Sequence, residues 1–372
     1  MINGEEFCGS MTTDRNSISH SHRRPAATRS RGVYAAVLAA LFLATAACSN
    51  LGSTAKSSVS NAMSVASMGV FSLHGEEVPV LDVNFESKGT ARANQTLVRY
   101  MIPEATNARP PVVLLPGFAL SADIYLQTPD GRQGWALEFL RAGHPVYLVE
   151  PAKTSRAGID PSVVNFGRSG TAEDEHWLFS WDQQTAWRRF GFGPSFGEPF
   201  SDGQLDPASY PNLVDMFTQV MIPGPGGRQM LNDSVAPTVG GLQALLERIG
   251  PAVVLVHSAS GLPGFRIAAK HPDLVQAVIN IEPVGCPGKN AGNFPDVPVL
   301  SVFGDHFEVR EQMTRRKSAC QQLVDNLNAR AIPAAMLSLP DLGIHGNSHL
   351  PMSERNSSEI AQLMIDWLAT LP

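Results

Sequence analysis

The sequence predicts an α/β fold in which helices cover both faces of a mostly parallel, doubly wound sheet. Two observations predict this class: short, continuously apolar runs alternate with longer amphipathic stretches, and most of these runs lack the polar alternation of a half-exposed strand. Strands that are apolar on both faces belong in the middle of a parallel sheet packed between helices. The 372 residues, 43% hydrophobic and 17% charged, are enough for one large domain with a substantial core.

Each element can be placed in order along the chain. The apolar runs predict strands over 97–102, 112–117, 145–150, 252–258, 277–282, 297–304 and 334–339. Amphipathic stretches predict helices over 134–142, 239–249, 262–270, 309–330 and 354–368. Gly250-Pro251 and His271-Pro272 follow two of these helices and end them, because proline cannot continue a helix.

One connection interrupts this alternation. The connection between the strand ending at Glu150 and the helix beginning at Val239 is far longer than usual, because such connections usually take a few residues. No clean hydrophobic period runs through it. We therefore predict an inserted cap over about 155–237. Its aromatic residues are Phe166, Trp177, Phe179, Trp181, Trp187, Phe190, Phe192, Phe196, Phe200, Tyr210 and Phe217. We expect most of these rings to form the core of the cap and the others to line an acyl or aryl pocket.

The first 47 residues have the pattern of a signal peptide. A basic segment with four arginines between 23 and 31 precedes an apolar run over 33–47, and small residues surround Cys48. The apolar run is too short to span a membrane. The chain is therefore predicted to be exported, either periplasmic or secreted, and acylation of Cys48 as a lipoprotein anchor is the alternative. Residues 48–77 are predicted to form a Ser/Ala-rich linker, followed by the folded domain over 78–372.

Charge and cysteine usage restrict the function further. A formal net charge of −6 offers no basic surface for DNA, RNA or other polyanions, so no nucleic-acid partner is expected. Of the four cysteines, Cys8 and Cys48 lie in or at the edge of the signal peptide. Cys286 and Cys320 remain, and in an exported protein such a pair predicts one disulfide, with two buried free thiols as the alternative.

The stretch 254–261, Val-Leu-Val-His-Ser-Ala-Ser-Gly, has the pattern of a nucleophile elbow. A sharp turn from strand to helix exposes the serine hydroxyl, and small residues around the serine let the turn form. Ser258 fits this position better than Ser260, because centring on Ser260 places Leu262 where the helix must pack closely. His257 lies before the nucleophile on the strand, should point to the opposite face, and is assigned a structural role.

Candidates for the general base follow the last predicted strand. His345 and His349 lie in the turn-rich run Gly343-Ile344-His345-Gly346-Asn347-Ser348-His349, where a loop can reach back over the elbow. We prefer His349, with His345 as the alternative. A metal pair is the other interpretation of two histidines four residues apart, but the glycines argue against a helix and no third ligand is evident, so no metal is predicted.

Two carboxylates are candidates for the acid, and one loop is the candidate for the oxyanion hole. Glu282 and Asp305 end two successive predicted strands at the sheet edge that carries Ser258, and the pattern alone does not choose between them. The run 116–119, Pro-Gly-Phe-Ala, follows a buried strand and offers backbone N–H donors, and the N–H of Ala259 would be the second donor.

From about Val112 to its C-terminus the sequence resembles a small, divergent family of exported bacterial carboxylesterases with the α/β-hydrolase fold. The motifs that carry this resemblance are Thr128-Pro129-Asp130-Gly131-Arg132-Gln133-Gly134-Trp135, His257-Ser258-Ala259-Ser260-Gly261, Ile281-Glu282-Pro283, Phe303-Gly304-Asp305-His306 and His345-Gly346-Asn347-Ser348-His349. The resemblance implies Glu282 as the acid, with Asp305 as the alternative, His349 as the base, and Phe118 and Ala119 in the oxyanion hole. Val256, Ala259 and Pro116 depart from the commoner family residues, so substrate preference does not transfer.

These observations predict a serine hydrolase of small-molecule carboxylic esters. Ser258 would attack the ester, His349 would carry the proton and Glu282 would hold its tautomer, with no cofactor. A lactonase or acyltransferase with the same triad is the alternative within enzymes. A non-catalytic α/β-hydrolase-fold binding protein is the alternative outside them. The oligomeric state is not predicted.

Overall fold

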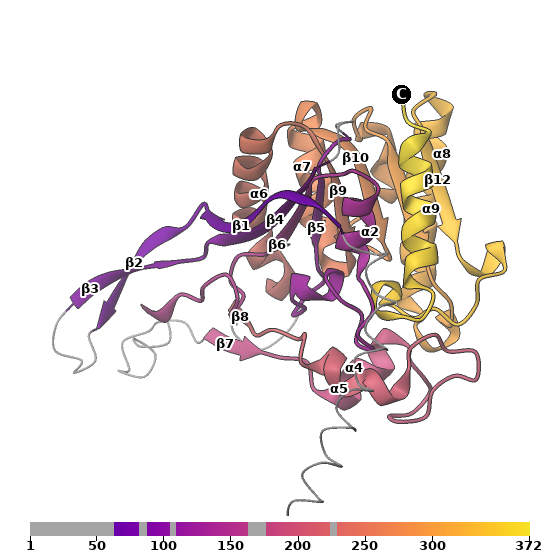
Figure 1. The fold of residues 1–372 in the computed structure, drawn as a ribbon, viewed down its shortest axis with the longest axis horizontal. Coiled ribbons are helices and arrows are strands. Elements are labelled where there is room, and N and C mark those ends of the chain that lie inside the picture. Colours follow the sequence, from indigo (N-terminus) through magenta and orange to yellow (C-terminus); the bar gives the residue numbers. More distant parts are fainter. Residues whose placement is uncertain (1–62, 82–87, 105–108, 163–175, 224–228) are drawn as a thin grey trace, which may run out of the picture. The chain divides into compact units, whose positions relative to one another are not determined.

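In the part of the chain that the computed structural model describes, the central sheet has eight strands in the order β1-β4-β6-β5-β9-β10-β11-β12 (Figure 1). Their bounds are β1 Val65–Leu73, β4 Thr96–Pro103, β5 Val112–Leu115, β6 Val146–Glu150, β9 Ala252–His257, β10 Val275–Ile281, β11 Val299–Phe303 and β12 Ala334–Ser338. β4 runs antiparallel to β1 and β6, and the other pairs are parallel. The predicted mostly parallel α/β sheet is confirmed.

The structure describes residues 63–81, 88–104, 109–162, 176–223 and 229–372. Met63–Pro372 form one compact unit. The predicted signal peptide over 1–47 and the alternative lipid anchor at Cys48 lie outside the described residues. Within them, no helix combines the length and the apolar character that crossing a membrane would require.

Helices cover both faces of the sheet because successive residues of each strand point to opposite sides (Figure 1). Val253 and Leu255 of β9 pack in one core cluster, whereas Val254 and Val256 pack in another. The first cluster includes residues of α2 Trp135–Arg141 and α9 Ser357–Ala369, and the second includes residues of α6 Gln229–Ile249, α7 Gly261–Lys270 and α8 Gln312–Ala329. Burying each such aliphatic side chain stabilises the fold by roughly 1.5–3 kcal/mol.

The prediction of a linker over 48–77 is wrong for its last part. Val65–Leu73 form strand β1, which pairs along its whole length with β4. After a short turn, β2 Glu76–Leu81 and β3 Lys88–Ala93 form an antiparallel hairpin. The composition misled because β1 is an edge strand stabilised by backbone hydrogen bonds, and of its side chains only Val65, Phe71 and Leu73 pack against the core clusters.

The connection between β6 and α6 has secondary structure of its own. Its elements are β7 His176–Phe179, α4 Gln183–Phe190, α5 Tyr210–Val214 and β8 Val220–Pro223, and β7 pairs antiparallel with β8. α6 begins at Gln229 rather than at Val239, so the predicted end of the cap at 237 and the start of this helix were wrong. The prediction failed because of Pro237, which lies inside α6 although proline is unfavourable in the interior of a helix. Val235 and Val239 on either side of it are buried.

The predicted disulfide is confirmed, because Cys286 and Cys320 are bonded. It joins the loop that follows β10 to α8.

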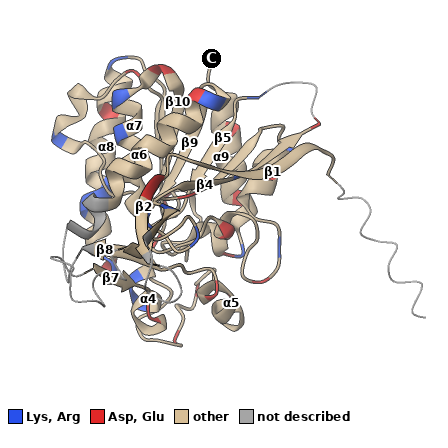
Figure 2. Ribbon diagram, turned by 90° about the vertical axis from the view of Figure 1, so that its left-hand side faces the viewer, with Lys and Arg blue, Asp and Glu red and all other residues tan. Residues whose placement is uncertain are grey.

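Charged side chains lie mainly on the helices and loops around the sheet (Figure 2). The buried charged exceptions are informative, because burial of a charge requires a partner. They are Glu150, Glu282, Arg310 and Glu354.

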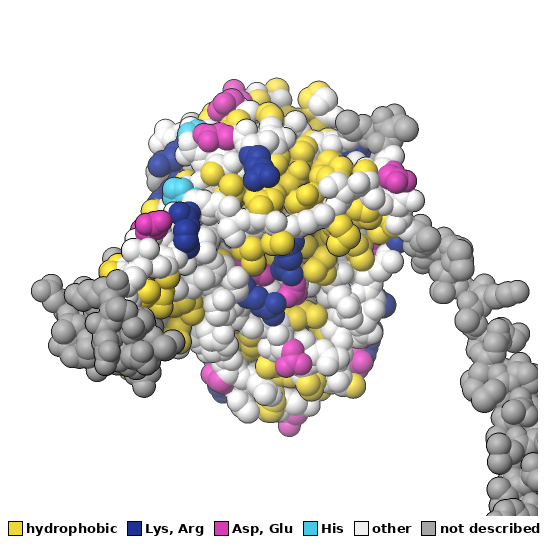
Figure 3. Space-filling model, turned by 60° about the vertical axis from the view of Figure 1, so that its left-hand side comes forward, with side chains coloured by type: hydrophobic (Ala, Val, Ile, Leu, Met, Phe, Trp, Pro, Cys, Tyr) yellow, Lys and Arg dark blue, Asp and Glu magenta, His cyan; other side chains and the backbone are white. Residues whose placement is uncertain are grey.

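Some large apolar side chains remain exposed. Met68 and Val70 lie on β1, and Trp177 and Leu178 lie on β7. Figure 3 turns the side that carries these strands toward the viewer and shows hydrophobic side chains spread over much of that face, with basic side chains near its centre.

Candidate active site

Ser258 lies in the turn that joins β9 to α7. β9 ends at His257, and Ser258 has a φ of 51°, in the left-handed region that a side chain rarely adopts. This strain is typical of a nucleophile elbow. The turn is possible because α7 starts with Gly261, where a Cβ would lie 2.3 Å from the carbonyl oxygen of Val284. The half-buried Ser258 side chain lines a cavity.

Ser260, the alternative nucleophile, is placed differently. Its side chain is buried, and its hydroxyl donates a hydrogen bond to the carbonyl oxygen of Pro116. That bond ties the elbow to the loop after β5.

His349 lines the same cavity as Ser258. Its backbone N–H donates to the carbonyl oxygen of Phe190 at 2.8 Å, and its ring stacks on the Phe190 ring at 5.8 Å between centroids. The Nε2 of buried His257 lies 2.8 Å from the His349 carbonyl oxygen. Burial holds the pKa of His257 well below its ordinary value, so its neutral ring donates this bond and supports the loop.

Glu282 is the carboxylate that meets His349. It follows β10 with a φ of 42°, is fully buried, and places Oε2 2.6 Å from His349 Nδ1. Burial alone would raise the pKa of Glu282, but the adjacent Arg310 guanidinium and His349 outweigh this effect and lower the pKa to about 2. Glu282 is therefore ionised and accepts a hydrogen bond from Nδ1–H of His349, which leaves Nε2 without a proton and able to accept one.

Arg310 is the functional residue that sequence reasoning missed. Its Nη1 lies 2.5 Å from Glu282 Oε2, its Nη2 lies 3.3 Å from Oε1, and both side chains are fully buried. It also donates to the carbonyl oxygen of Asp305. Gly191, at a φ of 80°, leaves room for it, because a Cβ there would lie 2.5 Å from Arg310 Nε. The sequence carried no signal of this pair, because an arginine at the start of a predicted helix is usually solvated.

A second buried carboxylate supports the loop that carries His349. Glu354 accepts from Asn347 Nδ2 at 2.6 Å and from the backbone N–H of Ser348 at 2.7 Å. Asn347 and Asn356 also bond to each other through their amides. These bonds hold both residues before His349 in place, so the loop does not depend on the His349–Glu282 contact alone.

The predicted oxyanion loop lies beside the elbow. Phe118 and Ala259 line the cavity with Ser258, and Ala119 adopts a φ of 58°. Trp181 Nε1 donates to the Phe118 carbonyl oxygen at 2.9 Å. Gly117 allows the loop to lie close to the end of β9, because a Cβ at this position would lie 2.7 Å from His257 Nδ1.

No protein-family model matches the chain. It is 25% identical over 319 residues to a probable secreted lipase, PhiG, of a fungus (Fungal sp. strain ATCC 74256), which covers 73% of this chain and 85% of the relative. It is 32% identical to a structurally characterised bacterial esterase, with a TM-score of 0.76 over 83% of this chain and 97% of the other. The chain belongs to the esterases of the α/β-hydrolase fold. It is a carboxylic ester hydrolase.

The cavity lined by Ser258 and His349, which is the candidate active-site cavity of the esterase, has a volume of about 380 Å³. Phe179, Trp181 and Phe190 from the insertion line it together with Phe118. Other rings of the insertion are buried in the main core: Trp187, Phe192, Tyr210 and Phe217. Phe166 lies outside the described residues. Trp177 and Phe196 are exposed, so the described aromatic residues of the insertion divide among a cavity wall, the core and the surface.

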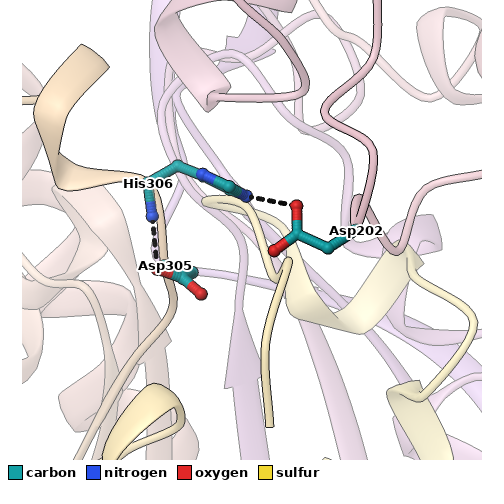
Figure 4. Close-up of side chains that lie close together, drawn as sticks. All are labelled: Asp202, Asp305 and His306. Carbon is teal, nitrogen blue, oxygen red and sulfur yellow. Dashed lines mark hydrogen bonds and ion pairs between the residues drawn. The ribbon is translucent and has the colours of Figure 1, made fainter.

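His345 and Asp305, the alternative base and the alternative acid of the esterase, contact each other and do not line the cavity with Ser258. His345 is exposed, and its Nδ1 lies 3.2 Å from Asp305 Oδ2. Asp305 also accepts from the backbone N–H of His306 at 2.8 Å, and His306 Nε2 lies 3.1 Å from Asp202 (Figure 4). Asp202, Asp305 and His306 each place one ligand atom within 4.8 Å of the others. The His306 ring is already paired, because its other nitrogen lies 3.1 Å from Glu308.

Proposed function

We propose that the esterase cleaves its substrates through an acyl-enzyme, with Ser258 as the nucleophile, His349 as the general base and Glu282 as the acid that orients the histidine. One observation carries the proposal: His349 shares a cavity with Ser258 while its Nδ1 lies 2.6 Å from the buried carboxylate of Glu282. This is the arrangement that activates a serine hydroxyl.

The first half-reaction forms the acyl-enzyme. His349 Nε2 takes the proton of Ser258 as Oγ bonds to the carbonyl carbon, and the carbonyl oxygen becomes an oxyanion. Backbone N–H groups of Phe118, Ala119 and Ala259 are the proposed donors to this oxyanion. When the intermediate collapses, the bond to the alcohol oxygen breaks and the imidazolium gives its proton to the leaving alkoxide.

The second half-reaction restores the enzyme. His349 takes a proton from water as the water oxygen bonds to the acyl carbon, and collapse releases the carboxylic acid while the proton returns to Ser258. Glu282 stabilises the imidazolium in both halves, and because it is ionised it keeps the proton on Nδ1 between them.

We also propose that the esterase is exported, with 1–47 removed as a signal peptide. The basic and apolar segments of its N-terminus support this proposal. So does the disulfide, because such bonds persist in oxidising compartments. N-terminal sequencing of protein recovered from the periplasm or medium tests it, and a cytosolic protein that keeps 1–47 would contradict it.

Hydrolysis of p-nitrophenyl esters, from acetate to long acyl chains, tests the triad. We expect Ser258→Ala to lower kcat by about 10⁵–10⁶-fold. Ser260→Ala is the matched control, because it removes a buried hydroxyl that bonds only to backbone and should cost about 1 kcal/mol of stability without abolishing turnover. Full activity in Ser258→Ala would overturn the proposal. If the wild-type enzyme hydrolyses none of these esters, a lactonase, an acyltransferase or a binding protein is favoured. Assays with lactone substrates, with acyl acceptors and with a serine-directed phosphonate distinguish these three alternatives.

A further inference from the structure

The active-site cavity has two chemically different walls. One wall consists of the aromatic rings around Phe118 and Trp181. The other carries polar side chains, among them Gln312 and Arg316 of α8 and Arg189 of α4. A cavity that served only apolar acyl chains would have no use for two guanidinium groups, because desolvating them against an apolar ligand costs free energy.

Arg316 is only partly solvated and has few acceptors. Its side chain is half-buried, and burial lowers its pKa from the ordinary value. Its Nη1 donates to the backbone carbonyl oxygen of Glu282 at 3.3 Å and lies 3.8 Å from the sulfur of Met313. These contacts leave most of its five N–H donors without a protein acceptor among the described residues. The carboxylate of Glu282 does not supply one, because it is engaged by Arg310 and His349.

Arg189 adds a second positive charge to the same cavity. It comes from the insertion, is exposed, and makes no ion pair with any residue in the described ranges. Its charge, like that of Arg310, lowers the pKa of Arg316 further, whereas the nearby charge of Glu282 raises it. Guanidinium groups that repel each other across one cavity are stabilised when an anion binds between them.

The cavity also continues past Arg316. A neighbouring groove of about 310 Å³ shares Arg316 and Gln312 with it and is lined by Arg315 and Cys286. The disulfide from Cys286 to Cys320 ties this loop to α8, the helix that carries Arg316. The basic group is therefore held at a defined distance from the elbow rather than on a free loop.

We infer that the esterase prefers esters that carry a carboxylate away from the scissile bond, with Arg316 and Arg189 binding that carboxylate while the aromatic wall holds the apolar part. A planar guanidinium matches a carboxylate with two parallel hydrogen bonds. The inference rests on the proposed function, because it takes Ser258 as the point where the ester is cleaved. It names the substrate class of that site: half-esters of dicarboxylic acids and esters of hydroxy- or phenol-carboxylic acids.

The test compares pairs of substrates in which a carboxylate is replaced by a neutral ester or amide of similar size. Mono-4-nitrophenyl adipate is the anionic ester, and 4-nitrophenyl methyl adipate is its neutral counterpart. On the alcohol side, 4-acetoxybenzoate is compared with 4-acetoxybenzamide. We expect kcat/KM of the intact enzyme to favour the anionic member of at least one pair by about 10–100-fold, the usual worth of a charge-assisted hydrogen bond. A ratio near one or below it for both pairs would overturn the inference.

Variants show which residues produce the ratio. Arg316→Gln should bring the anionic-to-neutral ratio close to one, and Arg189→Gln should lower it by a smaller factor. Arg266→Gln is the matched control, because Arg266 is an exposed arginine on α7 outside the cavity. An unchanged ratio in both cavity variants would overturn the inference. If Arg316→Gln does not fold, the anionic-to-neutral ratio is measured in Arg189→Gln alone, because Arg189 is exposed and its replacement should not disturb the fold.

Two further outcomes separate the possible failures. Competitive inhibition by inorganic phosphate but not by adipate would overturn the choice of carboxylate as the anion. Turnover of the neutral esters that depends on Ser258 without any preference for the anion would overturn this inference alone. Turnover that survives in Ser258→Ala would overturn the proposed function as well.

Discussion

Replacing Glu282 by glutamine tests the acid of the proposed triad. In the carboxylate, Oε1 accepts from the backbone N–H of Gly304 at 2.9 Å and from Arg310 Nη2 at 3.3 Å. Oε2 accepts from Arg310 Nη1 at 2.5 Å and lies 2.6 Å from His349 Nδ1. A glutamine keeps one accepting oxygen, because its NH₂ group only donates. Whichever way the amide turns, one pair of donors loses its acceptor.

The catalytic loss follows from the histidine tautomer. If the NH₂ group faces His349, Nδ1 must accept, the proton moves to Nε2, and Nε2 can no longer take the proton of Ser258. The corresponding replacement in the serine-protease triad lowers kcat about 10⁴-fold. We expect Glu282→Gln to lower kcat by about 10³–10⁴-fold, or about 4–5.5 kcal/mol of transition-state stabilisation. Loss of the charge opposite buried Arg310 should also lower the free energy of unfolding by about 3–5 kcal/mol.

The assay is steady-state hydrolysis of one p-nitrophenyl ester at a temperature where circular dichroism shows each variant folded. Asp305→Asn is the matched control. Asp305 is partly exposed and bonds to His345, Gly346 and His306, so its replacement should change kcat by less than about fivefold. A larger loss in Asp305→Asn than in Glu282→Gln would refute the choice of acid. If Glu282→Gln does not fold, the double variant with Arg310→Met removes the unpaired charge and allows the measurement.

The remaining predictions concern the surroundings of the triad. Burial lowers the pKa of His349, the Glu282 carboxylate opposes this effect, and the charge of Arg310 lowers the pKa further. Arg310→Met should therefore raise the pKa of His349 and move the acid limb of the kcat/KM profile to higher pH. An acid limb at the same pH would contradict the effect assigned to the Arg310 charge. Reduction of the disulfide should lower the unfolding free energy by about 3–4 kcal/mol, because it closes a 34-residue separation, and an unchanged melting curve with two titratable thiols would disprove the bond. Gly117→Ala places a Cβ against His257 and should lower kcat by about 10–100-fold, whereas Gly89→Ala, with open space around it, should leave kcat unchanged; equal effects would refute the steric argument.

Local patterns predicted most of the sheet and located the candidate residues at its edge. The runs that became β5, β9, β10 and β11 are mostly apolar, and nearly all of their residues are buried, which matches that pattern. The elbow could be located because its strained turn requires small residues at fixed spacing around Ser258. Patterns failed where a local signal was absent or misleading, as at β1, whose pairing is made by backbone, and at Pro237 inside α6.

Pairing between distant side chains could not be deduced in the same way. Both acids and both histidines were candidates, and the structure combines Glu282 with His349 and Asp305 with His345. Each pair joins loops that follow different strands, and the first spans 67 residues of sequence. Spacing along the chain carries no information on which of two neighbouring loops folds over the elbow.

By itself, the sequence determined the α/β class, seven of the eight strands of the central sheet, the serine in the turn after β9 and the small set of candidate residues that could act with it. Tertiary structure alone decided that Arg310 is buried against Glu282, that the insertion supplies one wall of the cavity, and that Arg189 and Arg316 line it together. The physical reason is that backbone conformation follows from neighbours in the sequence, whereas the pairing of charges and the shape of a cavity depend on which loops converge at the carboxyl edge of the sheet.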